Sequence, residues 1–517
     1  PDDIILSWTV QTESITPTLK RMRAAAQPAP TTIAPTGMTT AAVGGAGIAD
    51  IEIGIITLPY YSGISTPENP TAALTGFWKA APGAYVPPFD QFGLDPTSTN
   101  ITIANPMPVL TGMQTVPLLV TVPNANSGHT KPAGGWPVVI YGHGITRNRT
   151  DLLAIADTLA SIGYAAVAMD FPLHGVNPDE EPQLAGFYVE NTPFAPVANE
   201  RTFDTDIINN QTGAPGPDGL IDPSGTHWVT AALASMLTGR DTIRQGVADL
   251  SVLALSVPQM DFDDDTVPDT DGTNIAYVGH SWGAMHGTIL SAYEPLISRS
   301  VLSAPGGGIA RFAEASPTFG PPIRAGLYAE AGLEPGTADY EQFFIAWQTV
   351  LDSADPVNWV QEAASFTPIM LHEVIGDTVV PNYVATAPLS GTEPLIRVGA
   401  LALYSSTQQS ADGLRAAARF LPPAEHGSLI SPAYSATATV EMQTQMASFI
   451  ASHGGLIQVT DESTMQPIIA VPAVNVQPGV SEAGNTSGKS KSKSEPVAAA
   501  SPQAVHVPLR RGVRREN

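Results

Sequence analysis

The sequence contains no cysteine, and only 14% of its 517 residues are charged. Without cysteine, the protein can form no disulfide bond and can have no thiolate metal site and no cysteine nucleophile. Basic residues are the scarcer charged kind, because 23 Lys and Arg stand against 48 Asp and Glu, a net charge of −25. Such a surface repels polyanions, so we expect no nucleic-acid partner. No run approaches the roughly 18 consecutive apolar residues of a membrane-spanning helix, so we expect no transmembrane segment.

The first 460 residues change in character once, which predicts two folded domains. Residues 1–130 contain short β-prone runs separated by Pro, Gly and Thr, which predicts a β-rich N-terminal domain. Residues 131–460 alternate apolar strand-like runs with helical segments, the pattern of a mostly parallel α/β sheet. Two long inserts, near 176–245 and 306–364, interrupt this alternation. We expect them to form caps or lids over the carboxyl ends of the strands.

The end of the chain differs again in composition. Residues 461–517 are expected to form a C-terminal extension that is disordered from about residue 471, where the sequence is low in aromatics and locally basic. At the other end, the sequence begins with Pro1 rather than Met. This favours an exported protein whose signal segment is absent from this sequence.

The stretch IAYVGHSWGAMHG, residues 275–287, places Ser281 between two glycines. It matches the pattern G-x-S-x-G, with an apolar strand-like run before it and a helix-compatible run after it. Gly279 and Gly283 would permit the sharp strand-to-helix turn that exposes a serine hydroxyl. A serine hydroxyl is a weak nucleophile by itself, so it needs a base, an acid that orients the base, and donors for a developing oxyanion.

An acid and a base follow Ser281 in the order that this chemistry requires. Asp377 comes at the end of the apolar run in LHEVIGDTVVP, and His426 lies in the loop LPPAEHGSL. The order serine, acid, histidine is that of the α/β-hydrolase arrangement. Asp170, at the end of AAVAMDF, is the rival acid, but it precedes the serine. We therefore predict an α/β-hydrolase core with a mostly parallel sheet and cap or lid insertions, preceded by the β-rich domain.

The oxyanion donors are expected to be two backbone amides. One is the amide of Trp282, directly after the serine, and the other is the amide of Ile145 in VVIYGHGITRNR. In that loop, Gly142 and Gly144 would allow close approach of the backbone, and His143 is expected to brace the loop by hydrogen bonds. The indole of Trp282 can face the acyl site or pack beneath the turn, and the sequence leaves both open.

Several stretches resemble one family of enzymes. YGHGITRN, MDFPLHG, PDGLIDPSGTHW, GHSWGA, DSADPVNW and EHGS, with LPYYSG nearer the N-terminus, are similar to bacterial extracellular lipases of the virulence-factor lipase (Pla-1/cef) type. The resemblance implies a secreted or cell-surface carboxylester hydrolase that acts on lipids or lysophospholipids. Trp282 stands where an aliphatic residue is common in that group, which leaves room for bulky or aromatic esters.

An acidic run, DFDDDTVPDTDGTN, precedes the serine motif. Clustered carboxylates repel one another unless a hard cation or solvent relieves them, so a structural Ca²⁺ is one reading and a solvated acidic turn the other. The run that starts at Asp261 is not an EF-hand loop, because its sixth residue is Thr266, where an EF-hand loop has glycine. The candidate ligands are Asp261, Asp263, Asp265, Asp269 and Asp271.

The leading hypothesis is a serine carboxylester hydrolase, a lipase or esterase, that works through a Ser-His-Asp triad and an acyl-enzyme. It would require no cofactor. Its partner would be an ester substrate: a lipid, a lysophospholipid or a polyester. A polyester hydrolase acting on bulky or aromatic esters is one alternative, and a non-catalytic surface binding protein is another.

Overall fold

The computed structural model describes residues 13–66 and 68–468. The expected disorder from about residue 471 lies outside the described residues. Among the residues that are described, no helix is both long enough and apolar enough to cross a membrane.

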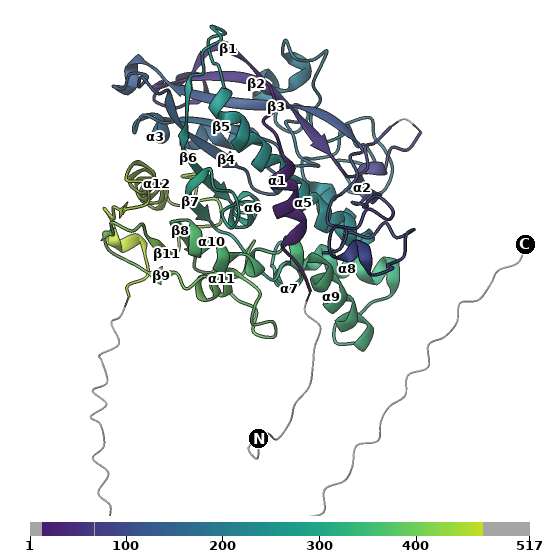
Figure 1. Ribbon diagram of the computed structural model, residues 1–517. Coiled ribbons are helices and arrows are strands. Elements are labelled where there is room, and N and C mark those ends of the chain that lie inside the picture. The colour runs from purple at the N-terminus through teal and green to yellow at the C-terminus, as the bar shows by residue number, and fades with distance from the viewer. Residues whose placement is uncertain (1–12, 67, 469–517) are drawn as a thin grey trace, which may run out of the picture. The chain divides into compact units, whose positions relative to one another are not determined.

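The centre of the protein is a ten-stranded sheet (Figure 1). Seven neighbouring strands are parallel, and the three N-terminal strands join one side of them in antiparallel fashion. Inner strands such as β5 and β8 are buried along their whole length, as expected for parallel strands covered on both faces. In sheet order the strands are β1 (Thr31–Thr39), β2 (Ala49–Tyr60), β3 (Gly112–Pro123), β5 (Ala165–Met169), β4 (Trp136–Gly142), β6 (Thr270–His280), β7 (Ile297–Ser303), β8 (Ile369–Val374), β11 (Arg415–Phe420) and β9 (Ala402–Leu403). A separate small pair joins β10 (Gln408–Gln409) to β12 (Leu456–Ile457).

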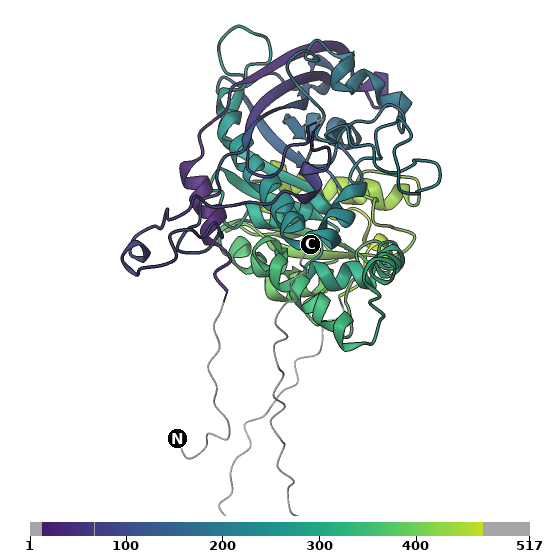
Figure 2. The same ribbon diagram turned by 90° about the vertical axis from the view of Figure 1, so that its right-hand side faces the viewer.

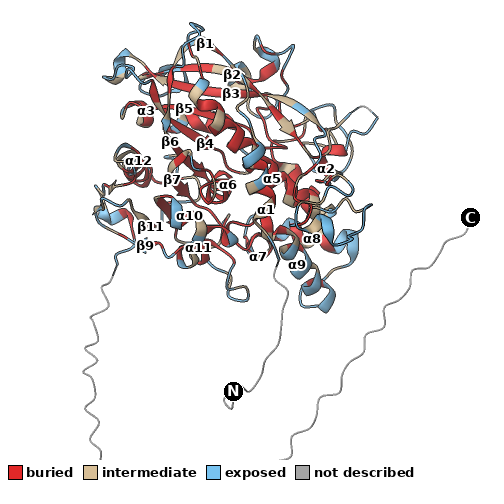
Figure 3. Cartoon of the chain, viewed as in Figure 1, coloured by how far each residue is buried: buried red, intermediate tan, exposed pale blue. Residues whose placement is uncertain are grey.

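Helices cover both faces of the sheet and define two hydrophobic cores (Figure 3). Successive side chains of a strand point to opposite faces of the sheet, so each strand contributes to both cores. In β4, Val138 and Ile140 belong to one core, and Val139 and Tyr141 belong to the other. The first core is packed by α1 (Pro17–Ala25), α5 (Met236–Ser256), α6 (Trp282–Leu290) and α10 (Val360–Phe366), the second by α3 (Leu153–Ala160) and α12 (Ala436–Ala451). The other helices are α2 (Ala72–Thr75), α4 (Thr226–Ala234), α7 (Ile309–Ala315), α8 (Gly320–Ala331), α9 (Ala338–Leu351) and α11 (Thr392–Val398).

The N-terminal strands are part of the main sheet rather than a separate domain. β3 pairs with β5, with Leu119 opposite Ala168, so hydrogen bonds cross the boundary expected near residue 130. Ile51 of β2 enters one core and Ile56 of the same strand enters the other, which ties these strands to both faces. The compact unit extends to Ile468. Figures 1 and 2 both show the purple N-terminal strands at one end of the molecule and green helices toward the other, where Figure 1 labels α8 and α9.

The two inserts supply helices at the carboxyl ends of the strands. The first contains α4, but its expected end at residue 245 falls inside α5, a buried helix that runs on to Ser256 and belongs to the core. The second contains α7, α8, α9 and most of α10. Helix α4 contacts α8, and α5 contacts α9, so the inserts pack against each other.

Candidate active site

Ser281 occupies a sharp turn between β6 and α6. Its backbone has φ 53° and ψ −112°, a region that non-glycine residues rarely adopt. Such a conformation costs on the order of 1–3 kcal/mol and persists only where the surroundings enforce it. Here the amide of Ser281 donates to the carbonyl of Ser303 at 2.8 Å, and the carbonyl of Ser281 accepts from the amide of Met285 at 3.0 Å.

Glycine is required on both sides of this turn because the backbones approach closely. A Cβ atom on Gly279 would lie 2.5 Å from the carbonyl oxygen of Gly283. One on Gly283 would lie 2.0 Å from the carbonyl oxygen of Gly142, at the end of β4. The Tyr277 hydroxyl closes the arrangement by donating to the Gly283 carbonyl at 2.6 Å. The first turn of α6 therefore rests on two adjacent strands and presents Ser281 at the edge of the sheet.

Asp377 and His426 lie on loops that follow β8 and β11, at the same edge. Nδ1 of His426 is 2.6 Å from Oδ2 of Asp377. The other carboxylate oxygen, Oδ1, accepts from the amides of Val379 at 2.7 Å and Val380 at 3.0 Å. The carboxylate is thus fixed by three hydrogen bonds, and with Nδ1–H donating to it, Nε2 of His426 is the nitrogen free to accept a proton.

Ser281 and His426 line one cleft, which also receives side chains from the loop after β4. Nε2 of His426 is buried and has no hydrogen-bond partner among the described residues. Ser281 is 3% exposed, so the hydroxyl is reached through this cleft rather than from open solvent. The structure therefore brings the predicted serine, histidine and acid to one place.

His280 is a residue of the site that sequence reasoning did not single out. Its Nε2 lies 2.9 Å from the carbonyl oxygen of His426 and donates to it, which fixes the loop that carries the histidine. Burial, followed by the neighbouring His426, lowers the pKa of His280 to about 3, so its ring is neutral. The serine motif requires no particular residue at this position, so the motif gave no signal for it.

Both residues that are predicted to supply the oxyanion amides lie near the serine. Trp282 is the first residue of α6, where an amide has no acceptor within the helix. Ile145 lines both cavities that meet at Ser281. Gly144 precedes it, and a Cβ atom on that glycine would come within 3.0 Å of His280 Nδ1. The loop after β4 therefore passes close to the serine turn.

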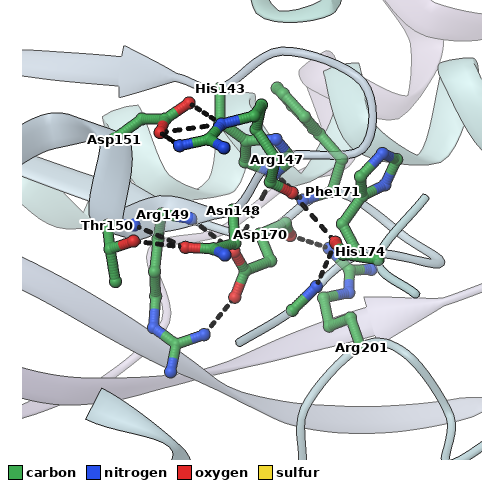
Figure 4. A network of polar contacts seen from close by, with 12 residues as sticks. His143, Arg147, Asn148, Arg149, Thr150, Asp151, Asp170, Phe171, His174 and Arg201 are labelled. Carbon is green, nitrogen blue, oxygen red and sulfur yellow. Dashed lines mark hydrogen bonds and ion pairs between the residues drawn. The ribbon is translucent and has the colours of Figure 1, made fainter. Parts of the chain in front are cut away.

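Buried polar contacts hold this loop in place (Figure 4). Nδ1 of His143 donates to the carbonyl of Gly144 at 2.7 Å, and its Nε2 accepts from the amide of Phe171 at 3.0 Å. Burial is the largest of the causes that lower the pKa of His143 well below its usual value, which matches a ring that donates from one nitrogen and accepts at the other. His143 thus joins the loop to the chain that follows β5.

Asp170, the rival acid, belongs to that bracing network and not to the serine. It accepts from the amide of Arg149 at 2.6 Å and pairs with the guanidinium of the same residue. The Arg149 guanidinium also binds Glu200 through both of its terminal nitrogens, at 2.7 and 2.8 Å. All three side chains are buried, so this ion-pair cluster is a structural support of the loop.

Two cavities meet at Ser281 and differ in size and polarity. The larger, about 910 Å³, is the cleft that also contains His426 and Arg147. The smaller, about 20 Å³, is wholly apolar and is bounded by helices of both inserts. Trp282 is among the residues that line it. The other aromatic residues of the wall are Trp228 of α4, Phe312 of α7 and Phe319.

In the acidic loop, three of the five predicted ligands come together. Carboxylate oxygens of Asp261, Asp263 and Asp265 lie within 4.8 Å of one another. Asp269 instead binds Lys131 and the amide of Phe262. Asp271 is likewise not part of the group, because its carboxylate accepts from the amide of Thr273 at 2.9 Å and from its hydroxyl at 2.6 Å. The five-ligand set is therefore wrong for Asp269 and Asp271, while calcium at the remaining three stays a prediction.

A mostly parallel sheet whose serine stands on a strand-to-helix turn, with an acid and a histidine from later strand ends, defines an α/β-hydrolase fold. The chain matches no family model, and no curated protein matches it.

Solved structures with a similar fold are remote in sequence. One is an acetyl xylan esterase from Paenibacillus sp. R4, at 13% identity and a TM-score of 0.39, over 79% of this chain and 86% of that one. Another is acetyl xylan esterase 1 from Thermoanaerobacterium sp. JW/SL YS485, at 13% identity and a TM-score of 0.40, over 82% of this chain and 92% of that one. An acylaminoacyl peptidase is 12% identical with a TM-score of 0.35, over 67% and 40% of the chains. These likenesses concern the fold alone.

Proposed function

We propose that the protein is a serine carboxylester hydrolase that works through an acyl-enzyme on Ser281. The observation that carries the proposal is the hydrogen bond between His426 Nδ1 and Asp377 Oδ2, at 2.6 Å, on a histidine that lines the same cleft as Ser281. With the Nδ1 proton given to Asp377, Nε2 of the same ring is the nitrogen that can accept a proton. A non-catalytic binding protein would need none of this alignment.

The reaction follows from the positions of the donors and acceptors. Nε2 of His426 takes the proton of Ser281 as the serine oxygen attacks the ester carbonyl carbon. The carbonyl oxygen becomes an oxyanion, which the amides of Ile145 and Trp282 stabilise. Nε2 then gives its proton to the alcohol oxygen as the carbon–oxygen bond breaks. Water then attacks the acyl-enzyme as Nε2 takes its proton, and Nε2 returns that proton to the serine oxygen as the acid is released. Asp377 stabilises the imidazolium each time it forms.

Replacement of the serine tests this function. We expect Ser281→Ala to lower kcat for 4-nitrophenyl acetate by on the order of 10⁶-fold, because the covalent route is lost. The fold should survive, since the bonds that fix Ser281 come from its backbone. Ser365→Ala, at an exposed position on α10, is the control and should leave kcat unchanged. Retention of wild-type turnover by the purified, folded Ser281→Ala variant would remove Ser281 from the mechanism.

The resemblance to extracellular lipases favours a secreted or surface-bound enzyme that acts on lipids or lysophospholipids, and Trp282 favours bulky or aromatic esters such as polyesters. These finer assignments depend on which side of Ser281 receives the acyl group and which receives the alcohol. The two cavities at the serine bear directly on that question.

A further inference from the structure

We propose that the substrate is a short-chain ester, an acetyl or propionyl ester of a bulky uncharged alcohol. This inference rests on the proposed function, because it assigns the acyl group and the alcohol to the two cavities that meet at Ser281. It differs from the long acyl chain of a lipid and from the aromatic acid of a polyester.

The position of His426 decides which cavity receives which half of the ester. The alcohol oxygen must lie beside Nε2 of His426, because that nitrogen protonates it as it leaves. His426 lines the large cleft and does not line the small cavity. The alcohol therefore occupies the large cleft. The acyl chain is the other substituent of the carbonyl carbon that Ser281 attacks. It therefore extends away from the cleft and enters the small cavity.

The small cavity limits the length of the acyl chain. Its free volume of about 20 Å³ is a small fraction of the about 910 Å³ of the cleft. Such a narrow space suits a short alkyl group, and we therefore assign a methyl or ethyl group to it. The cavity has no polar surface, which suits an alkyl group and gives a polar acyl chain no partner.

The walls are poorly able to move. The Trp228 and Trp282 rings pack edge to face with centroids 4.4 Å apart, and Nε1 of Trp228 donates to the carbonyl of Gly239 at 3.3 Å. Phe312 on α7 is 4% exposed and belongs to the main core, as does Met285 on α6. Enlarging the cavity would therefore require repacking of both insert helices and the core, which costs more than one extra methylene gains.

The large cleft favours an alcohol that is bulky and uncharged. Its volume of about 910 Å³ exceeds that of the acyl cavity by far. Arg147 lines it, but its guanidinium forms an ion pair with Asp151, with Nη2 2.6 Å from Oδ1. A carboxylate oxygen of Glu181 lies 3.7 Å from the same guanidinium. The charge of Arg147 is thus outweighed by those of Asp151 and Glu181, and the whole protein has a net charge of −25. An anionic headgroup would be repelled rather than bound.

The acyl half is tested with 4-nitrophenyl esters of acetate, propionate, butyrate and octanoate. We expect kcat/KM to fall at least tenfold between propionate and butyrate and further at octanoate, as one methylene in an apolar pocket is worth about 10–200-fold. A kcat/KM that rises from acetate to octanoate would overturn the assignment. If no ester in the series is hydrolysed, the proposed function itself fails, so the two failures are distinguishable.

Variants locate the length limit in the small cavity. We expect Phe312→Ala to raise the butyrate-to-acetate ratio of kcat/KM by about tenfold or more, because it opens the wall. Phe366→Ala is the matched control, since Phe366 is 70% exposed and lines neither cavity. If Phe312→Ala does not fold, Val229→Ala removes a partly exposed part of the same wall and should shift the ratio in the same direction. Unchanged ratios in folded wall variants would overturn the assignment.

The alcohol half is tested with two acetates of similar size. Methyl 4-acetoxybenzoate releases a neutral phenol derivative, whereas 4-acetoxybenzoate carries a carboxylate on its leaving group. After correction for spontaneous hydrolysis, we expect kcat/KM to be at least tenfold higher for the neutral ester, with the gap narrowing at high salt. Equal or faster hydrolysis of the anionic ester would contradict an uncharged alcohol.

Discussion

Asp377→Asn should damage catalysis more than the small chemical change implies, and the structure gives the reason. Oδ1 of Asp377 accepts two backbone hydrogen bonds, from Val379 and Val380. An asparagine would keep its oxygen there, because an amide nitrogen cannot accept from a backbone amide. Its NH₂ group would then face Nδ1 of His426, now 2.6 Å from Oδ2. The ring would have to accept at Nδ1 and carry its proton on Nε2, where it can no longer take the proton of Ser281.

The expected loss is about 10⁴-fold in kcat, the size of the effect that this tautomer change has in a serine-protease triad. It corresponds to about 5 kcal/mol of transition-state stabilisation at about 1.4 kcal/mol per factor of ten. The substrate half of the site is untouched, so KM for 4-nitrophenyl acetate should stay within about threefold. Stability should change little, because both backbone hydrogen bonds of Asp377 persist.

The assay is steady-state hydrolysis of 4-nitrophenyl acetate by purified wild type, Asp377→Asn and the exposed control Asp412→Asn, with urea unfolding of each. Asp412→Asn should match the wild type. A kcat within tenfold of wild type for folded Asp377→Asn would refute the account of the tautomer, and with it the assignment of Asp377 as the acid.

Three further predictions concern stability. Gly283→Ala should lower the unfolding free energy by roughly 3 kcal/mol, since its methyl would lie 2.0 Å from the Gly142 carbonyl oxygen, and a wild-type melting temperature would contradict this. Tyr277→Phe should cost about 1–3 kcal/mol in urea unfolding, because the buried Gly283 carbonyl loses its 2.6 Å hydrogen bond. Burial lowers the pKa of His286 from 6.5 to about 3, so below pH 6.5 the unfolded chain binds a proton here that the folded protein does not. The free energy of unfolding therefore falls as the pH falls from 6.5 toward 3. Between pH 7 and pH 5, the free energy of unfolding of His286→Phe should therefore decrease by roughly 2 kcal/mol less than that of the wild type, and equal decreases would refute this.

The catalytic candidates could be predicted because local pattern and chain order both report on them. A glycine on each side of Ser281 marks a turn that no other residue permits, as the contact of Gly283 with Gly142 shows. Asp377 and His426 each follow an apolar strand-like run, and the carboxyl ends of parallel strands meet at one edge of a sheet. The α/β-hydrolase fold predicted on these grounds is confirmed by the sheet.

What could not be predicted depends on contacts between distant parts of the chain. A β-prone run does not reveal its partner, so the pairing of β3 with β5 was missed and a separate N-terminal domain was expected in error. The walls of the small cavity, Trp228 and Phe312, come from inserts whose sequences show no pattern that points to Ser281. Asp269 was assigned to a metal cluster by proximity in sequence, whereas its carboxylate binds Lys131 across the fold.

The most direct test of the central claim is to trap the acyl-enzyme. Wild-type protein is mixed with excess 4-nitrophenyl acetate, quenched in acid within milliseconds, digested and mapped by mass spectrometry, with Ser281→Ala treated in parallel. The account predicts a burst of 4-nitrophenol and one acetyl group on the peptide that contains Ser281, absent from the variant. A burst with the acetyl group on another residue, or turnover that is equal in the variant, would contradict it.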